Sequence, residues 1–330
     1  NTTDADAEQQ QKRPEISVIV PAYNEEDNVE QVHKRLSDTL SAYAKSHEII
    51  FIDDGSQDRT YVALEGIFNK DETVKVIRFI RNFGQQMAVA AGLRAARGNA
   101  VVLIDADMQT APEEIPLLVD KLREGFDIVY GIRTKRKDPL WRRLGSWFVS
   151  HLLYRITNID VRDSASGFIA LDQNFVRHIN RFNEKTKFFS GLFAWLSYGR
   201  SAAVPVSHYP RTAGRTKYNF WRCLSTAMNF ICNFTTLPLR IIPITGALFV
   251  ASGVLGAAAL AGWSTARSQA PAGIWVLSAV LTIFTGIHLL AMGIIAEYLG
   301  RVFQEVKERP SFVILEELDH TNASNRARSK

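Results

Sequence analysis

Residues Ala100–Glu114, AVVLIDADMQTAPEE, place two carboxylates directly after an apolar run. Residues 100–104 have the apolar, β-branched composition of a buried strand, and residues 112–124 have helical periodicity with a proline in the first turn. Asp105 and Asp107 lie between these two segments. Ionised groups beside a core are unfavourable unless a partner compensates them. The stretch therefore predicts a strand, a helix and, between them, a pair of carboxylates that bind a ligand.

The same alternation of strand and helix extends over about the first 135 residues. Apolar runs predict further strands at residues 16–20, 48–52, 74–79 and 128–131, and periodic segments predict helices at 29–43 and 85–96. Strands and helices that alternate at this spacing form an α/β fold, in which a mostly parallel, Rossmann-like sheet is covered by helices on both faces. Ligands of such sheets bind at the carboxyl ends of the strands.

Carboxylates gather at those predicted strand ends. The first strand is followed by PAYNEE, the second by DDGS and the fourth by DADMQ. Like charges that meet at one edge repel unless a cation or a donor-rich ligand neutralises them. Asp107 and Gln109 offer oxygen ligands only, which suits Mg²⁺ or Mn²⁺ rather than zinc, and such ions keep open positions for substrate phosphates. We therefore predict a divalent cation that holds a diphosphate, with ordinary turn aspartates as the alternative.

The chain lacks the glycine-rich motifs of two common classes of nucleotide-binding protein. No G-x-G-x-x-G follows the first strand, and the chain has no G-x-x-x-x-G-K. The dinucleotide fold and the P-loop both need these glycine-rich cradles for phosphate. With two cysteines, the chain also has neither a disulfide framework nor a zinc motif.

Basic residues follow the acidic segments. They are Arg133, Lys135, Arg136, Lys137, Arg142 and Arg143, and later Arg211, Arg215 and Lys217. Some of them belong to ordinary solvated faces. Their position between the acidic edge and an apolar C-terminal region nevertheless favours a substrate phosphate at a membrane surface.

Two long uncharged stretches predict a membrane hairpin. Residues 241–266 and 268–296 carry no charge, and a bilayer span needs about 20 apolar residues. We predict spans at 238–263 and 273–296, joined by an extracytoplasmic loop at 264–272; a pair of buried core helices is the alternative. Lysines and arginines flank the pair, which places both chain ends in the cytoplasm. The expected location is the inner, or plasma, membrane, in a multi-pass arrangement.

The remaining divisions follow from composition. Residues 1–14 predict a disordered tail, without the apolar segment of a signal peptide. Residues 15–217 form the predicted catalytic domain, 218–236 an amphipathic helix in the membrane interface, and 297–330 a cytoplasmic C-terminal segment. Small residues in the first span would permit close helix packing, so a homo-oligomer is a hypothesis.

Six motifs together resemble family 2 glycosyltransferases of the GT-A fold. They are VIVPAYNEEDNV, IDDGSQDRT, RNFGQQMAVAAG, IDADMQTAPEEIPLLV, DIVYGIR and DSASGFIAL. More narrowly, they resemble the polyprenyl-phosphate glycosyltransferases, which include dolichol-phosphate mannose synthase, bactoprenol glucosyltransferases and the aminoarabinose transferases of lipid A modification. RTAGRTKYNFWRC and AEYLGRVFQEVKERP, on either side of the predicted spans, resemble the bacterial two-span branch. The resemblance covers about residues 15–312.

The resemblance implies a role for each matching residue. Asp105, Asp107 and Arg133 would be the catalytic residues. The nucleoside would be bound by Pro21, Tyr23, Glu25, Ile52, Asp54 and Asp105, and the divalent ion by Asp107 and Gln109. The lipid phosphate would be bound by Arg133, Ser146 and Arg142, with Arg143 as an alternative to Arg142. Arg211 and Lys217 would hold the donor diphosphate, and Asp163, Ser166 and Gly167 would line the sugar pocket.

The implied reaction moves a sugar, with inversion, from a nucleotide diphosphate sugar to a polyprenyl (undecaprenyl) phosphate at the cytoplasmic face. The product would serve glycan or lipopolysaccharide modification. A UDP-sugar is favoured, GDP stays open, and no nucleic acid partner is expected. A phosphate monoester has a second pKa of about 6, so the acceptor needs no strong base. The alternatives are a processive polysaccharide synthase and a non-catalytic membrane anchor or flippase partner.

Overall fold

The computed structural model describes residues 13–133, 167–182, 189–197, 200–207, 209, 273–307 and 309–320, with residues 248, 251, 255 and 258 as single helical positions. The chain divides into two compact units. The first comprises Asn1–Tyr154, Ile159–Lys217 and Arg309–Lys330, and the second Arg155–Asn158 and Tyr218–Glu308.

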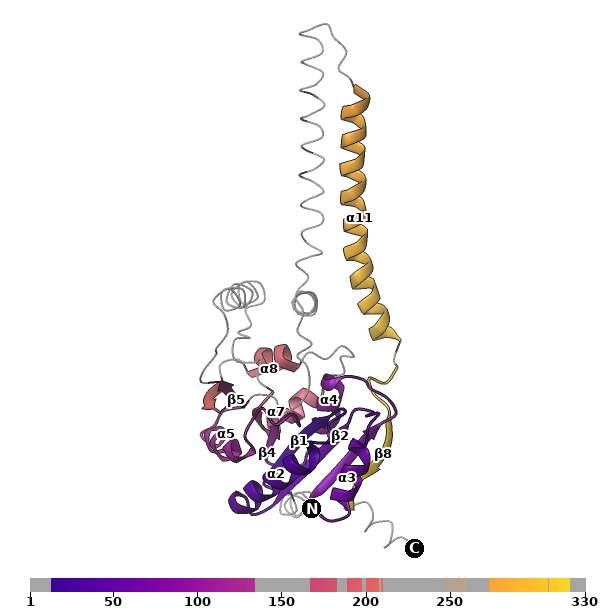
Figure 1. Ribbon diagram of the computed structural model, residues 1–330. Coiled ribbons are helices and arrows are strands. Elements are labelled where there is room, and N and C mark those ends of the chain that lie inside the picture. The colour runs from indigo at the N-terminus through magenta and orange to yellow at the C-terminus, as the bar shows by residue number, and fades with distance from the viewer. Residues whose placement is uncertain are drawn as a thin grey trace, which may run out of the picture. The chain divides into compact units, whose positions relative to one another are not determined.

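The described residues of the first unit form a sheet of eight strands in the order β7-β5-β6-β4-β1-β2-β3-β8 (Figure 1). The strands are β1 (Ile16–Ala22), β2 (His47–Asp53), β3 (Val74–Phe79), β4 (Ala100–Leu103), β5 (Ile128–Arg133), β6 (Ile169–Asp172), β7 (Ser201–Val206) and β8 (Ile314–Leu318). The five strands predicted from sequence are confirmed. The strands β4, β1, β2 and β3 run parallel, β7 runs parallel to β5, and β6 and β8 are antiparallel to their neighbours.

Helices cover both faces of this sheet. On one face lie α2 (Val29–Tyr43), α3 (Thr60–Phe68) and α5 (Ile115–Arg123), the last preceded by the 3₁₀ turn η1 (Pro112–Glu114). On the other lie α4 (Gln85–Ala95), α7 (Gln173–Asn180) and α8 (Phe189–Ser197). Val18 and Val20 of β1 pack toward the first group and Ile19 toward the second, because successive side chains of a strand alternate between faces. The predicted α/β fold is thus confirmed.

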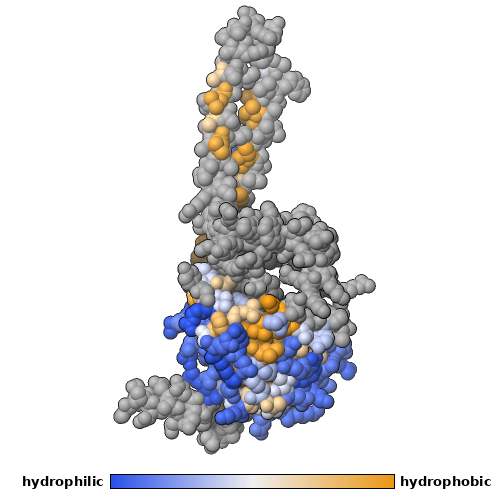
Figure 2. All heavy atoms as spheres, turned by 90° about the vertical axis from the view of Figure 1, so that its left-hand side faces the viewer, coloured by the Kyte–Doolittle hydropathy of each residue, from blue (hydrophilic) through white to orange (hydrophobic). Residues whose placement is uncertain are grey.

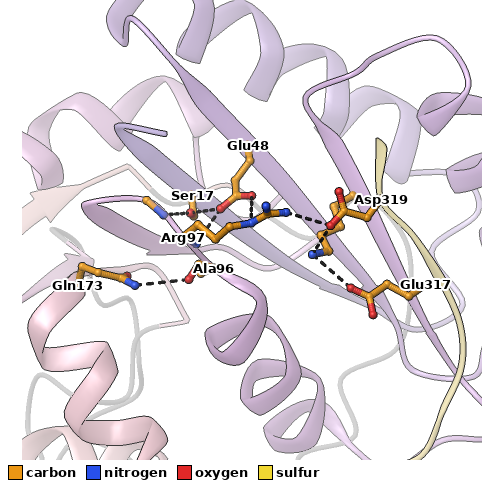
Figure 3. Close-up of polar contacts among 9 residues, drawn as sticks. Ser17, Glu48, Ala96, Arg97, Gln173, Glu317 and Asp319 are labelled. Atoms are coloured by element: carbon orange, nitrogen blue, oxygen red, sulfur yellow. Dashed lines mark hydrogen bonds and ion pairs between the residues drawn. The ribbon is translucent and has the colours of Figure 1, made fainter. Parts of the chain in front are cut away.

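Strand β8, from the C-terminal part of the chain, is held against the sheet by ion pairs (Figure 3). Lys75 of β3 is buried, and its Nζ lies 2.8 Å from Asp319 Oδ2 and 3.2 Å from Glu317 Oε1. Arg97 Nη2, before β4, also donates to Asp319 Oδ2, at 2.9 Å. Glu48 accepts hydrogen bonds from Ser17 Oγ and from the Arg97 backbone N–H. Charged groups at the amino ends of the strands therefore hold β8 against β3.

Replacement of Asp319 by alanine is expected to lower the free energy of unfolding by about 2–3 kcal/mol, because it leaves two cations, one of them buried, without their shared partner. Urea unfolding followed by far-UV circular dichroism measures the change. Glu124→Ala is the matched control, since it removes a carboxylate from the exposed Lys121–Glu124 pair at the end of α5 and should cost less than about 1 kcal/mol. Equal losses in the two variants would contradict a stabilising role for the Asp319 cluster.

The second unit contains α11 (Gly273–Val306), a helix of 34 residues. Many of its described side chains are large, apolar and exposed, among them Leu277, Met292, Leu299 and Phe303, and Figure 2 shows the hydrophobic colour of the described residues in this unit. The helix predicted at residues 273–296 is confirmed, and it continues ten residues further.

The predicted membrane spans are not confirmed. Within the ranges given above, no helix combines the length and the apolarity that a bilayer crossing requires. The predicted span at 238–263 falls outside the described residues except at residues 248, 251, 255 and 258. The interfacial helix at 218–236 and the loop at 264–272 fall wholly outside them. The C-terminal segment predicted at 297–330 holds the end of α11 and, unexpectedly, the strand β8.

Candidate active site

Three parallel neighbours, β2, β1 and β4, end side by side at the carboxyl edge of the sheet. Tyr23, Asp54 and Asp105 follow these strands by one or two residues. Strand β5 points the same way, but β6 separates it from β4. Because β6 is antiparallel, it begins at this same edge, and Gly167, two residues before it, reaches Asp105 after β4. The loops after β1, β2 and β4, which carry the predicted carboxylates, therefore begin at one edge of the sheet.

The loops after β1 and β2 are joined by hydrogen bonds. The Asn24 N–H donates to Ser56 Oγ at 3.0 Å, and Asn24 Oδ1 accepts from the Gln57 N–H at 2.9 Å. The Glu25 N–H donates to Thr60 Oγ1 at 2.8 Å. Asn24 adopts a left-handed backbone with φ of 56°, which asparagine tolerates better than most residues. These hydrogen bonds hold the two loops together and order this part of the carboxyl edge, here called the rim.

The residues predicted to bind a nucleoside take different positions on this rim. Pro21 and Ile52 are buried partners in the β1–β2 register, and Ile52 belongs to the core on the α4 side of the sheet. Tyr23 is 40% exposed and presents an aromatic ring at the edge. The Glu25 carboxylate accepts from Asn28 Nδ2 at 2.6 Å. These placements suit a nucleoside pocket, and the binding roles stay predictions.

Asp54 holds the backbone of the segment before α4. Its side chain is buried, and its two carboxylate oxygens accept from the N–H groups of Phe83, at 2.7 Å, and Gly84, at 2.9 Å. Burial raises the pKa of Asp54, and the two backbone hydrogen bonds oppose that rise. The carboxylate therefore fixes the start of α4. Its predicted contact with a nucleoside stays untested.

The aspartates of the D-A-D segment differ in their surroundings. Asp105 Oδ1 accepts from the side-chain amide of Gln85 at 2.7 Å. Asp107 Oδ1 accepts from the Gln109 N–H at 3.1 Å, in a tight turn whose middle residue Met108 has φ of 60°. Asp107 and Gln109 consequently lie on one turn. No donor among the described residues contacts Asp107 Oδ2.

Gly167 lies against Asp105. A Cβ atom at residue 167 would lie 2.3 Å from Asp105 Oδ2, closer than real Cβ atoms approach an oxygen. An alanine at residue 167 would therefore force the Asp105 carboxylate or this segment to move. Sequence motifs placed Gly167 in the sugar pocket, and the structure brings it to the first aspartate.

The segment after β7 lies beside the same turn. The Tyr209 N–H donates to the Gln109 backbone carbonyl at 2.9 Å. The Ser207 N–H donates to both carboxylate oxygens of Glu114, at 2.9 and 3.0 Å. The chain that continues toward Arg211 thus starts at the predicted metal turn. Sequence reasoning missed Glu114 and Tyr209 because their contacts join segments far apart along the chain.

Several predicted site residues cannot be placed in this way. Arg133 is the last residue of β5, where its backbone pairs with Val206, and its side chain lies outside the described part. The other predicted residues that fall outside the described residues are Arg142, Arg143, Ser146, Asp163, Ser166, Arg211 and Lys217. Their roles toward the lipid phosphate, the sugar and the donor diphosphate stay predictions.

The donor chemistry of the turn suits a hard divalent ion. Asp107 and Gln109 present oxygen ligands, and the described ranges hold no group of three or more His, Cys, Asp or Glu side chains arranged for a metal. Mg²⁺ and Mn²⁺ fit such a site, because they are commonly held by one or two carboxylates together with substrate phosphates and water. A dedicated cage of protein ligands is not required.

Comparison with known proteins gives concordant results. The family model described as "Glycosyl transferase family 2" matches residues 17–197. An uncharacterized glycosyltransferase of Synechocystis sp. is 36% identical over 304 residues, which cover 91% of this chain and 94% of that protein. An undecaprenyl-phosphate 4-deoxy-4-formamido-L-arabinose transferase of Pseudomonas paraeruginosa is 34% identical over 302 residues, 91% of this chain and 89% of that protein.

A solved structure shows a more distant similarity. Glucosyl-3-phosphoglycerate synthase from Mycobacterium tuberculosis, in complex with Mn²⁺, uridine diphosphate and glucosyl-3-phosphoglycerate, aligns with a TM-score of 0.48 at 22% identity. The alignment covers 68% of this chain and 80% of that one. The family model spans more than half of this chain, and relatives above 30% identity span nearly all of it. The chain therefore belongs to glycosyl transferase family 2 and is a glycosyltransferase enzyme.

Proposed function

We propose that this enzyme transfers a sugar from a nucleotide diphosphate sugar to undecaprenyl phosphate, or a similar polyprenyl phosphate, with inversion at the anomeric carbon. One observation supports the acceptor more than any other. The 34% identity to the undecaprenyl-phosphate 4-deoxy-4-formamido-L-arabinose transferase extends over 91% of the chain, whereas the family model ends at residue 197. The likeness therefore includes most of the C-terminal part, which a transferase with a soluble acceptor would not need.

The donor would bind at the carboxyl ends of β1, β2 and β4. Tyr23, directly after β1, offers an exposed ring for a base. Asp105 and Asp107 stand at the next strand end, where a nucleotide lying across the edge would have its ribose and diphosphate. A Mg²⁺ or Mn²⁺ ion held by Asp107 and Gln109 would supply charge stabilisation of the departing nucleoside diphosphate.

The acceptor phosphate would act as its own nucleophile. At neutral pH a phosphate monoester is mostly dianionic, so the chain has to position it and shield its charge rather than remove a proton. Arg133, Ser146 and Arg142, or Arg143, are the proposed ligands of this phosphate, and Arg211 and Lys217 those of the donor diphosphate. The contact between Tyr209 and Gln109 supports the second pair, because Arg211 follows two residues later.

The second unit would bring the enzyme to its lipid. The described part of α11 exposes large apolar side chains, among them Leu281, Ile295 and Val302, which water solvates poorly and lipid accepts. We propose membrane attachment through this unit, with the active site on the cytoplasmic side. Insertion as two spans is the arrangement that the uncharged stretches of sequence predict.

The experiment uses purified full-length protein in detergent, with undecaprenyl phosphate, Mn²⁺ or Mg²⁺, and a series of UDP- and GDP-sugars. Release of nucleoside diphosphate is measured with and without the lipid. Release that requires the lipid and occurs with one donor would support the proposal and identify the sugar. Release that is equally fast without lipid would contradict a polyprenyl phosphate acceptor, and growth of a polymer on the product would indicate a processive synthase instead.

A further inference from the structure

Two consecutive glutamines begin α4, and they face different partners. Gln85 donates a hydrogen bond from Nε2 to Asp105 Oδ1 at 2.7 Å. Gln86 accepts one at Oε1 from the Phe189 N–H of α8 at 3.1 Å. Gln85 thus contacts the predicted donor site, whereas Gln86 links α4 to α8.

We propose that Gln85 is a positioning residue, which orients the Asp105 carboxylate for the metal–nucleotide complex; this inference rests on the proposed function. A carboxylate that follows a strand end can rotate about its Cβ–Cγ bond. The amide of Gln85 holds one oxygen, and the Gly167 backbone packs beside the other. These two contacts restrict the rotation of the carboxylate, and so determine how it faces a ligand at this edge of the sheet.

The position of Gln85 is itself fixed by its neighbours. Asp54 holds the N–H groups of Phe83 and Gly84, the two residues immediately before Gln85. Gly84 has φ of 94°, a conformation that glycine adopts at little cost. The buried carboxylate at the end of β2 therefore determines where α4 starts, and α4 places the amide that meets the carboxylate at the end of β4. This gives Asp54 a role that does not require contact with a nucleoside.

The chemistry of glutamine suits this position. An amide donates a hydrogen bond without a formal charge, whereas a lysine or arginine at residue 85 would bring a positive charge beside the predicted divalent cation and compete with it. The side chain of Gln85 is exposed. When a nucleotide covers this edge, less water competes for the hydrogen bond and it strengthens. The contact consequently matters more for ligand binding than for folding.

The test measures binding and folding separately in full-length protein. Calorimetric titration with UDP, or with GDP if the wild type prefers it, is carried out with and without Mn²⁺, and thermal unfolding is recorded without ligand. Gln85→Leu should weaken Mn²⁺-dependent binding about tenfold, the low end for a hydrogen bond to a charged group, because Gln85 is exposed. Its melting temperature should stay within about 2 °C of the wild type, as for most surface substitutions.

Two further variants make the result specific. Gln85→Asn keeps the amide but shortens the side chain by one methylene, so it should weaken binding as Gln85→Leu does. Gln86→Leu loses the contact to Phe189 and should lower the melting temperature while the folded protein binds the nucleotide normally. In transfer assays Gln85→Leu should lower kcat/KM for the donor and leave KM for the lipid unchanged.

The alternatives lead to different observations. Wild-type binding by Gln85→Leu, or an equal loss in Gln86→Leu, would overturn the positioning role. A drop in melting temperature that accounts for the lost binding would show that Gln85 is structural only. If the wild type itself binds neither UDP nor GDP with Mn²⁺ or Mg²⁺, the proposed function fails, and the role of Gln85 fails with it.

Discussion

Asp107→Ala is expected to lower the rate of lipid-dependent sugar transfer by about a thousandfold while the protein stays folded. The substitution removes the carboxylate whose Oδ1 closes the turn with Gln109 and whose Oδ2 faces no described donor. Loss of the charge stabilisation that a bound metal ion provides, worth several kcal/mol, corresponds to a rate loss of this size. The rate of nucleoside diphosphate release at saturating donor and lipid measures it.

Asp38→Ala is the matched control for Asp107→Ala. Asp38 is an exposed carboxylate within the helix α2 and does not belong to the loops at the carboxyl edge of the sheet. Its removal changes net charge in the same way and should leave the transfer rate within twofold. Transfer by Asp107→Ala at a tenth of the wild-type rate or faster would show that Asp107 does not hold the metal.

Gly167→Ala is expected to lower kcat about a hundredfold. The added Cβ would lie 2.3 Å from Asp105 Oδ2 and 3.0 Å from its Cγ, so either the carboxylate or the start of β6 has to move. A displacement approaching 1 Å near a reacting centre costs about two orders of magnitude in rate. Steady-state kinetics with varied donor concentration measure the loss, and circular dichroism checks that the fold is kept.

Gly66→Ala provides the comparison for Gly167→Ala. Gly66 lies within α3, and a Cβ there meets nothing within 4 Å. Alanine favours a helix over glycine by about 1 kcal/mol, so this variant should be as stable as the wild type or more stable, with normal activity. If the kcat of Gly167→Ala stays within threefold of the wild-type value, the close approach of residue 167 to Asp105 is not required for catalysis.

The local pattern of apolar residues was enough to predict the centre of the fold. Strands such as Ile16–Ala22 are continuous apolar runs, buried on both faces, and helices such as Val29–Tyr43 repeat their apolar residues with a period of 3.6. The carboxyl-edge site followed from the same pattern, because parallel neighbours end at the same side. Asp105, Asp107 and Gln109 could therefore be selected without coordinates.

The strands β6, β7 and β8 were not predicted in this way. Strand β6 has only four residues, Ile169–Asp172, too few for a clear alternation, and it enters the sheet antiparallel between β4 and β5. Strand β8 carries two adjacent glutamates, so its sequence suggests a solvated segment. The structure shows that it pairs with β3. The sheet is accordingly mixed at its outer parts, where the sequence alone favoured mostly parallel pairing.

The α/β core and the carboxyl edge with its aspartates could be predicted from the sequence alone, because those properties depend on neighbours along the chain. Which polar groups become partners depended on the three-dimensional arrangement of the strands. Lys75 is buried only because Asp319 returns to the sheet beside it. Asp105 meets Gln85 and Gly167 because strand order brings three distant segments together. Such contacts depend on chain topology, which local periodicity does not specify.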